Sequence, residues 1–210
     1  PRADTRRNVM VFLADDLGYG DCGGRPGAAP TPNIDRLARE GVRYRNGYVT
    51  AAVCAPSRAG LLSGRHQARF GFEFNPVGRD ERIGIPPAQR TIADVMRGAG
   101  YETALIGKWH VGQAAGYHPL DRGFDHFFGL LGGATSYFPA GTRDIVIGDM
   151  GRVDAAQSRE NIPIFNQREE VDPPGYLTER FGDAAIDYIA ARRDRPYFLY
   201  FSPNAPHTPL

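Results

Sequence analysis

The stretch Cys54-Ala55-Pro56-Ser57-Arg58-Ala59-Gly60-Leu61-Leu62-Ser63-Gly64-Arg65 places a cysteine immediately before a proline-started apolar helix. Proline is tolerated at the first helical position because its missing N–H would have no partner there. The start of a helix carries a partial positive charge and free N–H groups, so it attracts anions. Cys54 therefore lies where an anionic group is stabilised, and Arg58 is placed to help hold it. This arrangement suits chemistry on a sulfate or phosphate group.

Residue type alone leaves two other interpretations of Cys54 open. A cysteine ahead of a short helix is commonly a small buried apolar residue. A cysteine at a helix start can also be a thiol nucleophile with a lowered pKa. The two cysteines, Cys22 and Cys54, are too few for a disulfide framework. We expect Cys22 to be a structural small residue.

Outward from this stretch, short apolar runs alternate with amphipathic segments, a pattern that predicts an α/β sandwich. Strands are expected at 8–14, 42–49, 101–106, 125–131 and 196–201, and helices at 31–41, 91–100 and 177–193. The segment 140–174 is polar and punctuated by proline and glycine. We expect a long excursion there, with a small hairpin at 144–153.

Polar side chains follow three of the expected strands. Asp15 and Asp16 follow the first strand, Lys108 and His110 follow the strand at 101–106, and His207 follows the last. Ligands of open α/β sheets bind at the carboxyl ends of strands, so these residues are candidates for one site. Adjacent carboxylates repel each other and call for a cation such as calcium or magnesium. A solvated strand exit is the alternative for the two aspartates, and a structural histidine is the alternative for each histidine.

Composition narrows the class of protein. The 210 residues include 25 basic and 24 acidic side chains, and this balance argues against a nucleic-acid surface built on a general positive field. No stretch is apolar and long enough to span a membrane. Lys108 is the only lysine in an arginine-rich chain. A compact ammonium in place of a planar guanidinium indicates a specific role at that position.

Four segments together resemble the sulfatase family. The stretch at 54–65 resembles its signature Cys-x-Pro-Ser-Arg followed by Leu-Leu-Ser/Thr-Gly-Arg, and 107–112 (Gly-Lys-Trp-His-Val-Gly) resembles its second signature. The segment 14–21 resembles the family's opening motif, and 205–209 resembles the segment with its later histidine. The resemblance implies an alkaline-phosphatase-like fold, with a mixed, largely parallel sheet sandwiched between helices.

The resemblance also implies how the nucleophile is made and held. In the family a maturation enzyme oxidises the signature cysteine, here Cys54, to formylglycine, which is hydrated in the active enzyme. Asp15, Asp16 and the modified Cys54 would then be ligands of a divalent cation, usually Ca²⁺, with Mg²⁺ as the alternative. Arg58 would steady the modified Cys54 and the metal-bound carboxylates.

Three further residues take roles in the reaction by the same resemblance. Lys108 would bind sulfate oxygens and offset charge in the transition state. His110 would contact the formylglycine hydroxyl and accept a proton. His207 would bind sulfate and protonate the leaving alcohol. The expected substrate is an aryl or carbohydrate sulfate ester.

The resemblance covers residues 8–210, whereas the family's catalytic domain continues past that point with a further Asp/Asn pair of metal ligands and a second sulfate-binding lysine. We therefore expect residues 1–210 to be the N-terminal portion of a single sulfatase catalytic domain that is inactive alone. The resemblance favours a periplasmic or secreted location, although the chain does not open on a signal-peptide pattern.

Three other functions stay open. A phosphonate or phosphate ester hydrolase of the same superfamily would share the fold and the metal. A non-catalytic fragment would only fold or bind anions. A plain cysteine hydrolase would use the thiol of Cys54, although it has no evident need for Asp15 and Asp16.

Overall fold

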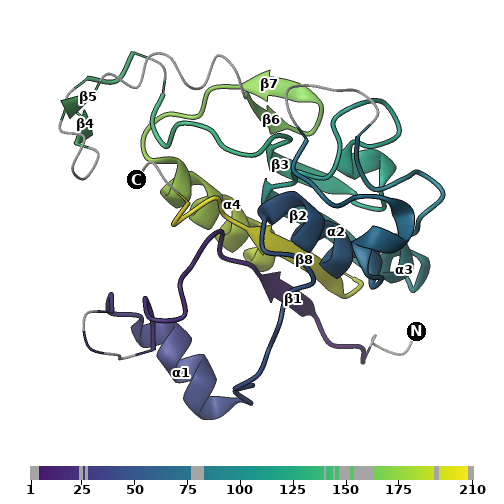
Figure 1. The fold of residues 1–210 in the computed structure, drawn as a ribbon, viewed down its shortest axis with the longest axis horizontal. Coiled ribbons are helices and arrows are strands. Elements are labelled where there is room, and N and C mark those ends of the chain that lie inside the picture. The colour runs from purple at the N-terminus through teal and green to yellow at the C-terminus, as the bar shows by residue number, and fades with distance from the viewer. Residues whose placement is uncertain are drawn as a thin grey trace.

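A six-stranded sheet in the order β1-β8-β2-β3-β6-β7 forms the centre of the molecule (Figure 1). The computed structural model describes residues 5–23, 26, 28–76, 83–139, 141–143, 145–146, 152–153, 163–191 and 194–207. The strands are β1 (Val9–Phe12), β2 (Glu102–Lys108), β3 (His126–Leu130), β6 (Ile164–Asn166), β7 (Glu169–Val171) and β8 (Tyr197–Ser202). The first four strands along the sheet pair in parallel, and β6 and β7 pair antiparallel. The expected mixed, largely parallel sheet is confirmed.

Helices cover both faces of this sheet. Helices α2 (Cys54–Ser63) and α3 (Ile92–Gly98) pack on one face, and α4 (Leu177–Ala190) packs on the other. Successive side chains of a strand point to opposite faces. Accordingly, Leu105 belongs to the core under α2 and α3, whereas Ala104 and Ile106 belong to the core under α4. Burial on both faces explains why β2 is almost continuously apolar.

Shorter elements complete the structure. The 3₁₀ turns η1 (Gln67–Phe70) and η2 (Pro119–Asp121) lie in connections. Helix α1 (Pro32–Glu40) stands away from the sheet in Figure 1, and none of its residues is buried. No helix in the part of the chain that the structure describes has the length and hydropathy of a membrane span.

The pairing of the neighbouring strands β2 and β8 leaves no room for a side chain at Gly107. A Cβ built there would lie 2.0 Å from the carbonyl oxygen of Ser202, and the residue has φ +115°, which side chains rarely adopt. Only glycine satisfies both conditions. The parallel pairing of β2 with β8 brings the carboxyl ends of the two strands, and the residues that follow them, together.

Three segments differ from the sequence-based expectation. The strand expected at 42–49 is absent although all of its residues are described, and its apolar side chains are exposed, Tyr48 by 88%. Apolar residues alone do not make a strand, because its backbone groups need a partner edge. The excursion at 140–174 contains β6 and β7, which were not expected. The hairpin expected at 144–153 is present as the antiparallel pair β4 (Ile145–Val146) and β5 (Arg152–Val153), while Asp144 lies outside the described residues.

Candidate active site

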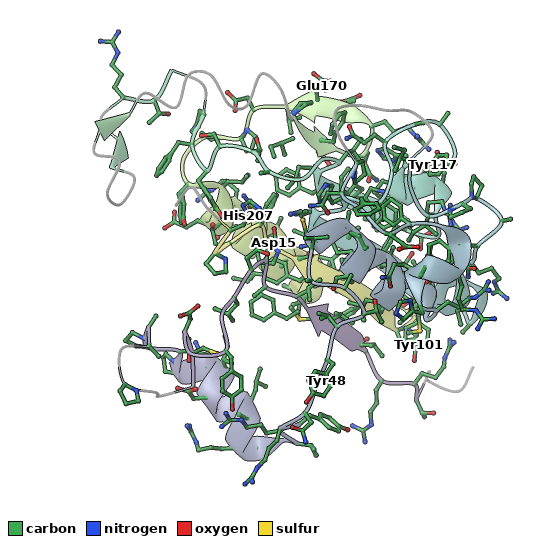
Figure 2. All side chains as sticks on the ribbon, in the orientation of Figure 1. Asp15, Tyr48, Tyr101, Tyr117, Glu170 and His207 are labelled. Carbon is green, nitrogen blue, oxygen red and sulfur yellow. The ribbon has the colours of Figure 1, made fainter. Side chains whose placement is uncertain are left out.

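The candidate site lies where β1, β8 and β2 end side by side. Because these three strands are parallel neighbours, the residues that follow them meet at one edge of the sheet. The backbone N–H of Asp15 donates to the carbonyl of Ala205 at 3.1 Å, which joins the segment after β1 to the segment after β8. Asp15 and His207 lie in the same region of the molecule (Figure 2). The predicted convergence of the three strand ends is confirmed.

Asp15 is the centre of a buried ion network. Its Oδ2 accepts a hydrogen bond from Nζ of Lys108 at 2.6 Å, and its Oδ1 accepts one from Nη2 of Arg58 at 3.0 Å. Arg58 also donates from Nη1 to the backbone oxygen of Lys108 at 2.8 Å and to Oγ of Ser202 at 2.5 Å. Asp15, Arg58 and Lys108 are 3%, 2% and 0% exposed. Two cations thus face one carboxylate, and the local charge is net positive.

This network sets the ionisation of Asp15. Burial raises the pKa of the carboxyl, but the charges and hydrogen bonds of Arg58 and Lys108 outweigh burial and hold the pKa below its usual value. Asp15 is therefore a carboxylate at neutral pH. An ionised carboxylate is the form that binds a cation.

His110 follows Lys108 and turns its backbone into the left-handed region, with φ +59°. Its N–H donates to the carbonyl of Leu131 at 3.2 Å, and its side chain is buried. Burial, followed by the charges of Lys108 and Arg58, lowers its pKa to about 3. A neutral imidazole can accept a proton, and Nδ1 has no hydrogen-bond partner among the described residues.

Gly133 leaves the space that the imidazole of His110 occupies. A Cβ at this position would lie 2.8 Å from both Cε1 and Nε2 of the ring. These distances are shorter than real Cβ contacts. Any other residue at 133 would displace the ring or the segment after β3.

Cys54 lies in the first turn of α2, not before it. The helix begins at Cys54, so Pro56 is its third residue, where the N–H groups still lack helical partners. The N-cap residue Val53 makes no side-chain cap. Asn75 supplies one instead, since its Oδ1 accepts the N–H of Ala55 at 2.9 Å and lies 3.6 Å from Sγ of Cys54.

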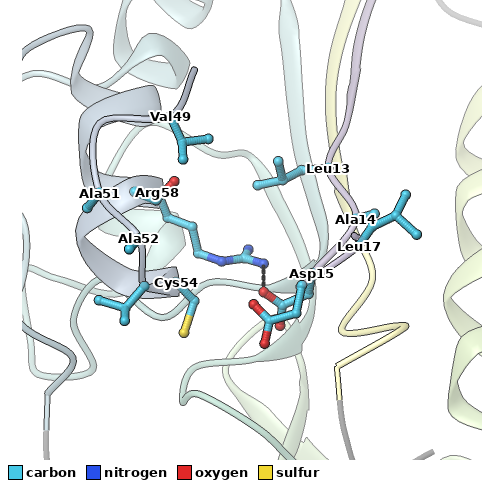
Figure 3. A pocket seen from close by; sticks show the side chains of 12 residues that line it. Leu13, Ala14, Asp15, Leu17, Val49, Ala51, Ala52, Cys54 and Arg58 are labelled. Carbon is cyan, nitrogen blue, oxygen red and sulfur yellow. Dashed lines mark hydrogen bonds and ion pairs between the residues drawn. The ribbon is translucent and has the colours of Figure 1, made fainter. Parts of the chain in front are cut away.

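A pocket of about 280 Å³ lies between α2 and the end of β1. Asp15, Asp16, Cys54, Ser57 and Arg58 line it together with apolar residues of 13–17 and 49–53. Figure 3 shows Cys54 and Asp15 on opposite sides of the same space, with the guanidinium of Arg58 reaching from the helix to Asp15. Lys108 contacts Asp15, but neither Lys108 nor His110 lines the pocket.

Asp16 and His207 form the outer part of the site. Nε2 of His207 lies 3.6 Å from Oδ2 of Asp16, and the two side chains form an ion pair when the imidazole is protonated. The two side chains are 25% and 60% exposed, in that order. Solvent therefore reaches both groups, in contrast to the buried Asp15.

All seven residues expected from the sequence lie at this edge of the sheet, but they do not form a closed metal cage. Within the described ranges, no group of three His, Cys, Asp or Glu side chains is placed to hold a metal ion. Three further residues that shape the site could not be found from the sequence: Asn75, Gly133 and Ser202. Their residue types carry no spacing signal, because each meets the site only through the tertiary fold.

Comparisons with known proteins show the family to which the chain belongs. The family description "Sulfatase" matches residues 7–210. The chain belongs to the sulfatase family. Arylsulfatase G of Mus musculus is 35% identical over 97% of the chain, and N-acetylgalactosamine-6-sulfatase of Homo sapiens is 33% identical over 97% of it.

Solved structures share the fold of this chain. The crystal structure of Ps i-CgsB in complex with k-i-k-neocarrahexaose superposes on this chain with a TM-score of 0.83 at 33% identity, covering 97% of the chain and 46% of that structure. The chain spans about two fifths of the length of its curated relatives, 42% of arylsulfatase G and 40% of N-acetylgalactosamine-6-sulfatase.

Proposed function

We propose that the protein hydrolyses sulfate esters through a formylglycine made from Cys54, assisted by a divalent cation. The observation that carries this proposal is the pocket between α2 and β1. There the signature cysteine shares one space with the two aspartates and with Arg58. A plain cysteine hydrolase has no evident need for Asp15 and Asp16, whereas an enzyme acting on a sulfate group needs concentrated positive charge of the kind that Arg58 and Lys108 supply.

Cys54 is well placed to present a nucleophile once it is modified. Asn75 holds the first turn of α2, and the modified side chain would project from the same backbone position toward Asp15. One hydroxyl of the hydrated aldehyde would attack sulfur in line, the bond from sulfur to the alcohol oxygen would break, and a covalent sulfate ester would form. His110, neutral at neutral pH, would then take a proton from the second hydroxyl, so that its oxygen closes the aldehyde again and sulfate leaves.

Lys108 and His207 act on the substrate in this proposal. The ammonium of Lys108 has three N–H donors, and its bond to Asp15 uses one of them, so further donors remain for sulfate oxygens. Lys108 is fully buried, so this contact requires the group to reach past Asp15. His207, at the solvent side, is the group that protonates the leaving alcohol.

The acidic residues of the site fit a hard cation. Asp15 and Asp16 supply carboxylate oxygens, the donors that Ca²⁺ and Mg²⁺ prefer, and Cys54 after modification adds a further oxygen. A bound cation would polarise the nucleophile and orient the sulfate group. It would compete with Lys108 and Arg58 for the oxygens of Asp15. Because Ca²⁺ takes about six to eight oxygen ligands, these residues are a partial ligand set.

The names of the relatives support the substrate class. N-acetylgalactosamine-6-sulfatase is named for a carbohydrate sulfate, and Ps i-CgsB was solved with an oligosaccharide. Arylsulfatase G is named for aryl sulfates. We infer a carbohydrate or aryl sulfate ester as substrate, with a formylglycine-generating enzyme as the maturation partner.

Residues 1–210 correspond, in this proposal, to the N-terminal portion of a single catalytic domain. The match with arylsulfatase G covers 97% of this chain but only 42% of that protein. Among the described residues, no group of three His, Cys, Asp or Glu side chains is placed to hold a metal ion. We expect the isolated chain to bind metal weakly and to turn over little or no sulfate ester. A robust rate from the isolated chain would contradict this part of the proposal.

Peptide mass spectrometry across Cys54 tests the nucleophile. The complete protein, co-expressed with a formylglycine-generating enzyme, should carry an aldehyde at residue 54 and hydrolyse an aryl sulfate, whereas Cys54→Ala should do neither. A thiol at Cys54 in a fully active preparation would refute the proposed nucleophile. A strong preference for an aryl phosphonate over the matched aryl sulfate would refute sulfate as the substrate group.

A further inference from the structure

The segment 203–207, which carries His207 after β8, is held by hydrogen bonds to its main chain. Within it, the N–H of His207 donates to the carbonyl of Asn204 at 2.9 Å. From the side of β1, the N–H of Asp15 donates to the carbonyl of Ala205 at 3.1 Å. These bonds fix the middle of the segment but leave the carbonyl of His207 itself to another partner.

Tyr137 is that partner. Its hydroxyl lies 2.7 Å from the carbonyl oxygen of His207 and 2.9 Å from that of Asn204, so one side chain ties both ends of the turn. The residue is 4% exposed. Burial raises the pKa of Tyr137, so the phenol stays protonated and donates.

Tyr137 is itself anchored outside the site. Its backbone carbonyl accepts the N–H of Leu177, the first residue of α4, at 2.7 Å. Its ring packs against that of Tyr176 with centroids 5.7 Å apart. The hydroxyl therefore connects the start of α4, on one face of the sheet, to the turn that ends in His207.

We propose that Tyr137 is a positioning residue that holds the imidazole of His207 where it can protonate the leaving alcohol. This inference rests on the proposed function, in which His207 is the general acid. Tyr137 does not touch the reacting atoms in this account. It acts through the backbone of His207, and small displacements of a catalytic group lower the rate steeply.

The substitution Tyr137→Phe keeps the ring and removes both hydrogen bonds to the turn. A general acid matters most when the leaving alcohol is a poor leaving group, because a good leaving group departs as the anion without a proton. We expect kcat/KM to fall about tenfold for an alkyl or sugar sulfate and less than about twofold for a nitrophenyl sulfate. The ratio of the two rates does not depend on how much of the variant is folded.

The experiment compares both substrates on the complete protein as wild type, Tyr137→Phe, His207→Ala and the double variant. Tyr176→Phe is the matched control, since it removes a hydroxyl from the ring that packs on Tyr137, and its rate ratio should equal that of the wild type. If Tyr137 acts through His207, its substitution has no further effect on the ratio in the His207→Ala background.

An equal loss on both substrates, an unchanged ratio, or additive effects in the double variant would each overturn the inference. These outcomes are distinct from failure of the proposed function. If the proposed function itself were wrong, the wild type would hydrolyse neither sulfate ester.

Discussion

Mild acid should weaken the fold through His118, which lies apart from the candidate active site. Its Nδ1 accepts the N–H of Leu120 at 3.2 Å, and its ring meets that of Phe127 edge-on with centroids 5.2 Å apart. Burial, followed by the positive charge of Arg168, lowers the pKa of His118 from 6.5 to about 4. The folded protein therefore resists a proton that the unfolded chain accepts.

The sign and the size of the effect follow from proton linkage. As pH falls below 6.5, the unfolded state takes up the proton first, so the unfolding free energy decreases until pH reaches the folded pKa of about 4. Each pH unit within this window corresponds to about 1.4 kcal/mol. Between about pH 7 and about pH 5 the loss from His118 amounts to about 2 kcal/mol.

Urea unfolding of the complete protein, followed by circular dichroism, measures this loss. His118→Gln does not titrate, so the free-energy gap between it and the wild type should close by about 2 kcal/mol as the pH falls from about 7 to about 5. Phe127→Leu removes packing from the same ring without removing the titrating group, and its gap should stay nearly constant. A gap for His118→Gln that is independent of pH would refute the reasoning.

Three further outcomes are expected. Lys108→Met breaks the buried 2.6 Å ion pair with Asp15 and should lower the unfolding free energy by about 3 kcal/mol in urea denaturation. Arg168→Met breaks an equally short ion pair with Asp121 at the surface and should lower the unfolding free energy by less than about 1 kcal/mol in the same assay. Equal losses for the two variants would contradict the role given to burial. Asn75→Ala removes the side chain that caps α2 and should lower the unfolding free energy by about 1 kcal/mol. Asn75→Asp keeps an oxygen acceptor at this position and should largely avoid that loss. Gly133→Ala places a Cβ 2.8 Å from the ring of His110 and should reduce kcat for an aryl sulfate at least about tenfold with the protein still folded; unchanged kcat would show that this ring position does not matter.

The alternation of apolar and amphipathic segments predicted most of the sheet and the helices on its two faces. The prediction was wrong at 42–49, where β-branched and aromatic residues lie exposed without a partner strand. It also missed β6 and β7, each of three residues, because so short a strand carries no measurable period. Both errors have one cause: strand formation depends on a neighbouring edge that the local sequence does not specify.

In the candidate site too, local sequence indicates some features and the tertiary fold alone decides others. The motif residues Asp15, Cys54, Lys108 and His207 could be singled out in advance because each follows or begins a recognisable element. Their partners could not be. The motif around Lys108 does not indicate that its ammonium pairs with Asp15 at 2.6 Å in the buried site. A pairing across 93 residues depends on which strands become neighbours.

The sequence by itself determined the family, the largely parallel sheet and the candidate site residues, since local patterns and short motifs encode these features. Only the tertiary structure decided how those residues are charged and held. Asp15 is ionised because two cations converge on it, and His110 is neutral because it is buried beside them. The turn of His207 is tied by Tyr137, whose backbone is bonded to the start of α4. The reason is physical, because burial and electrostatic energy depend on distances in space between groups that lie far apart along the chain.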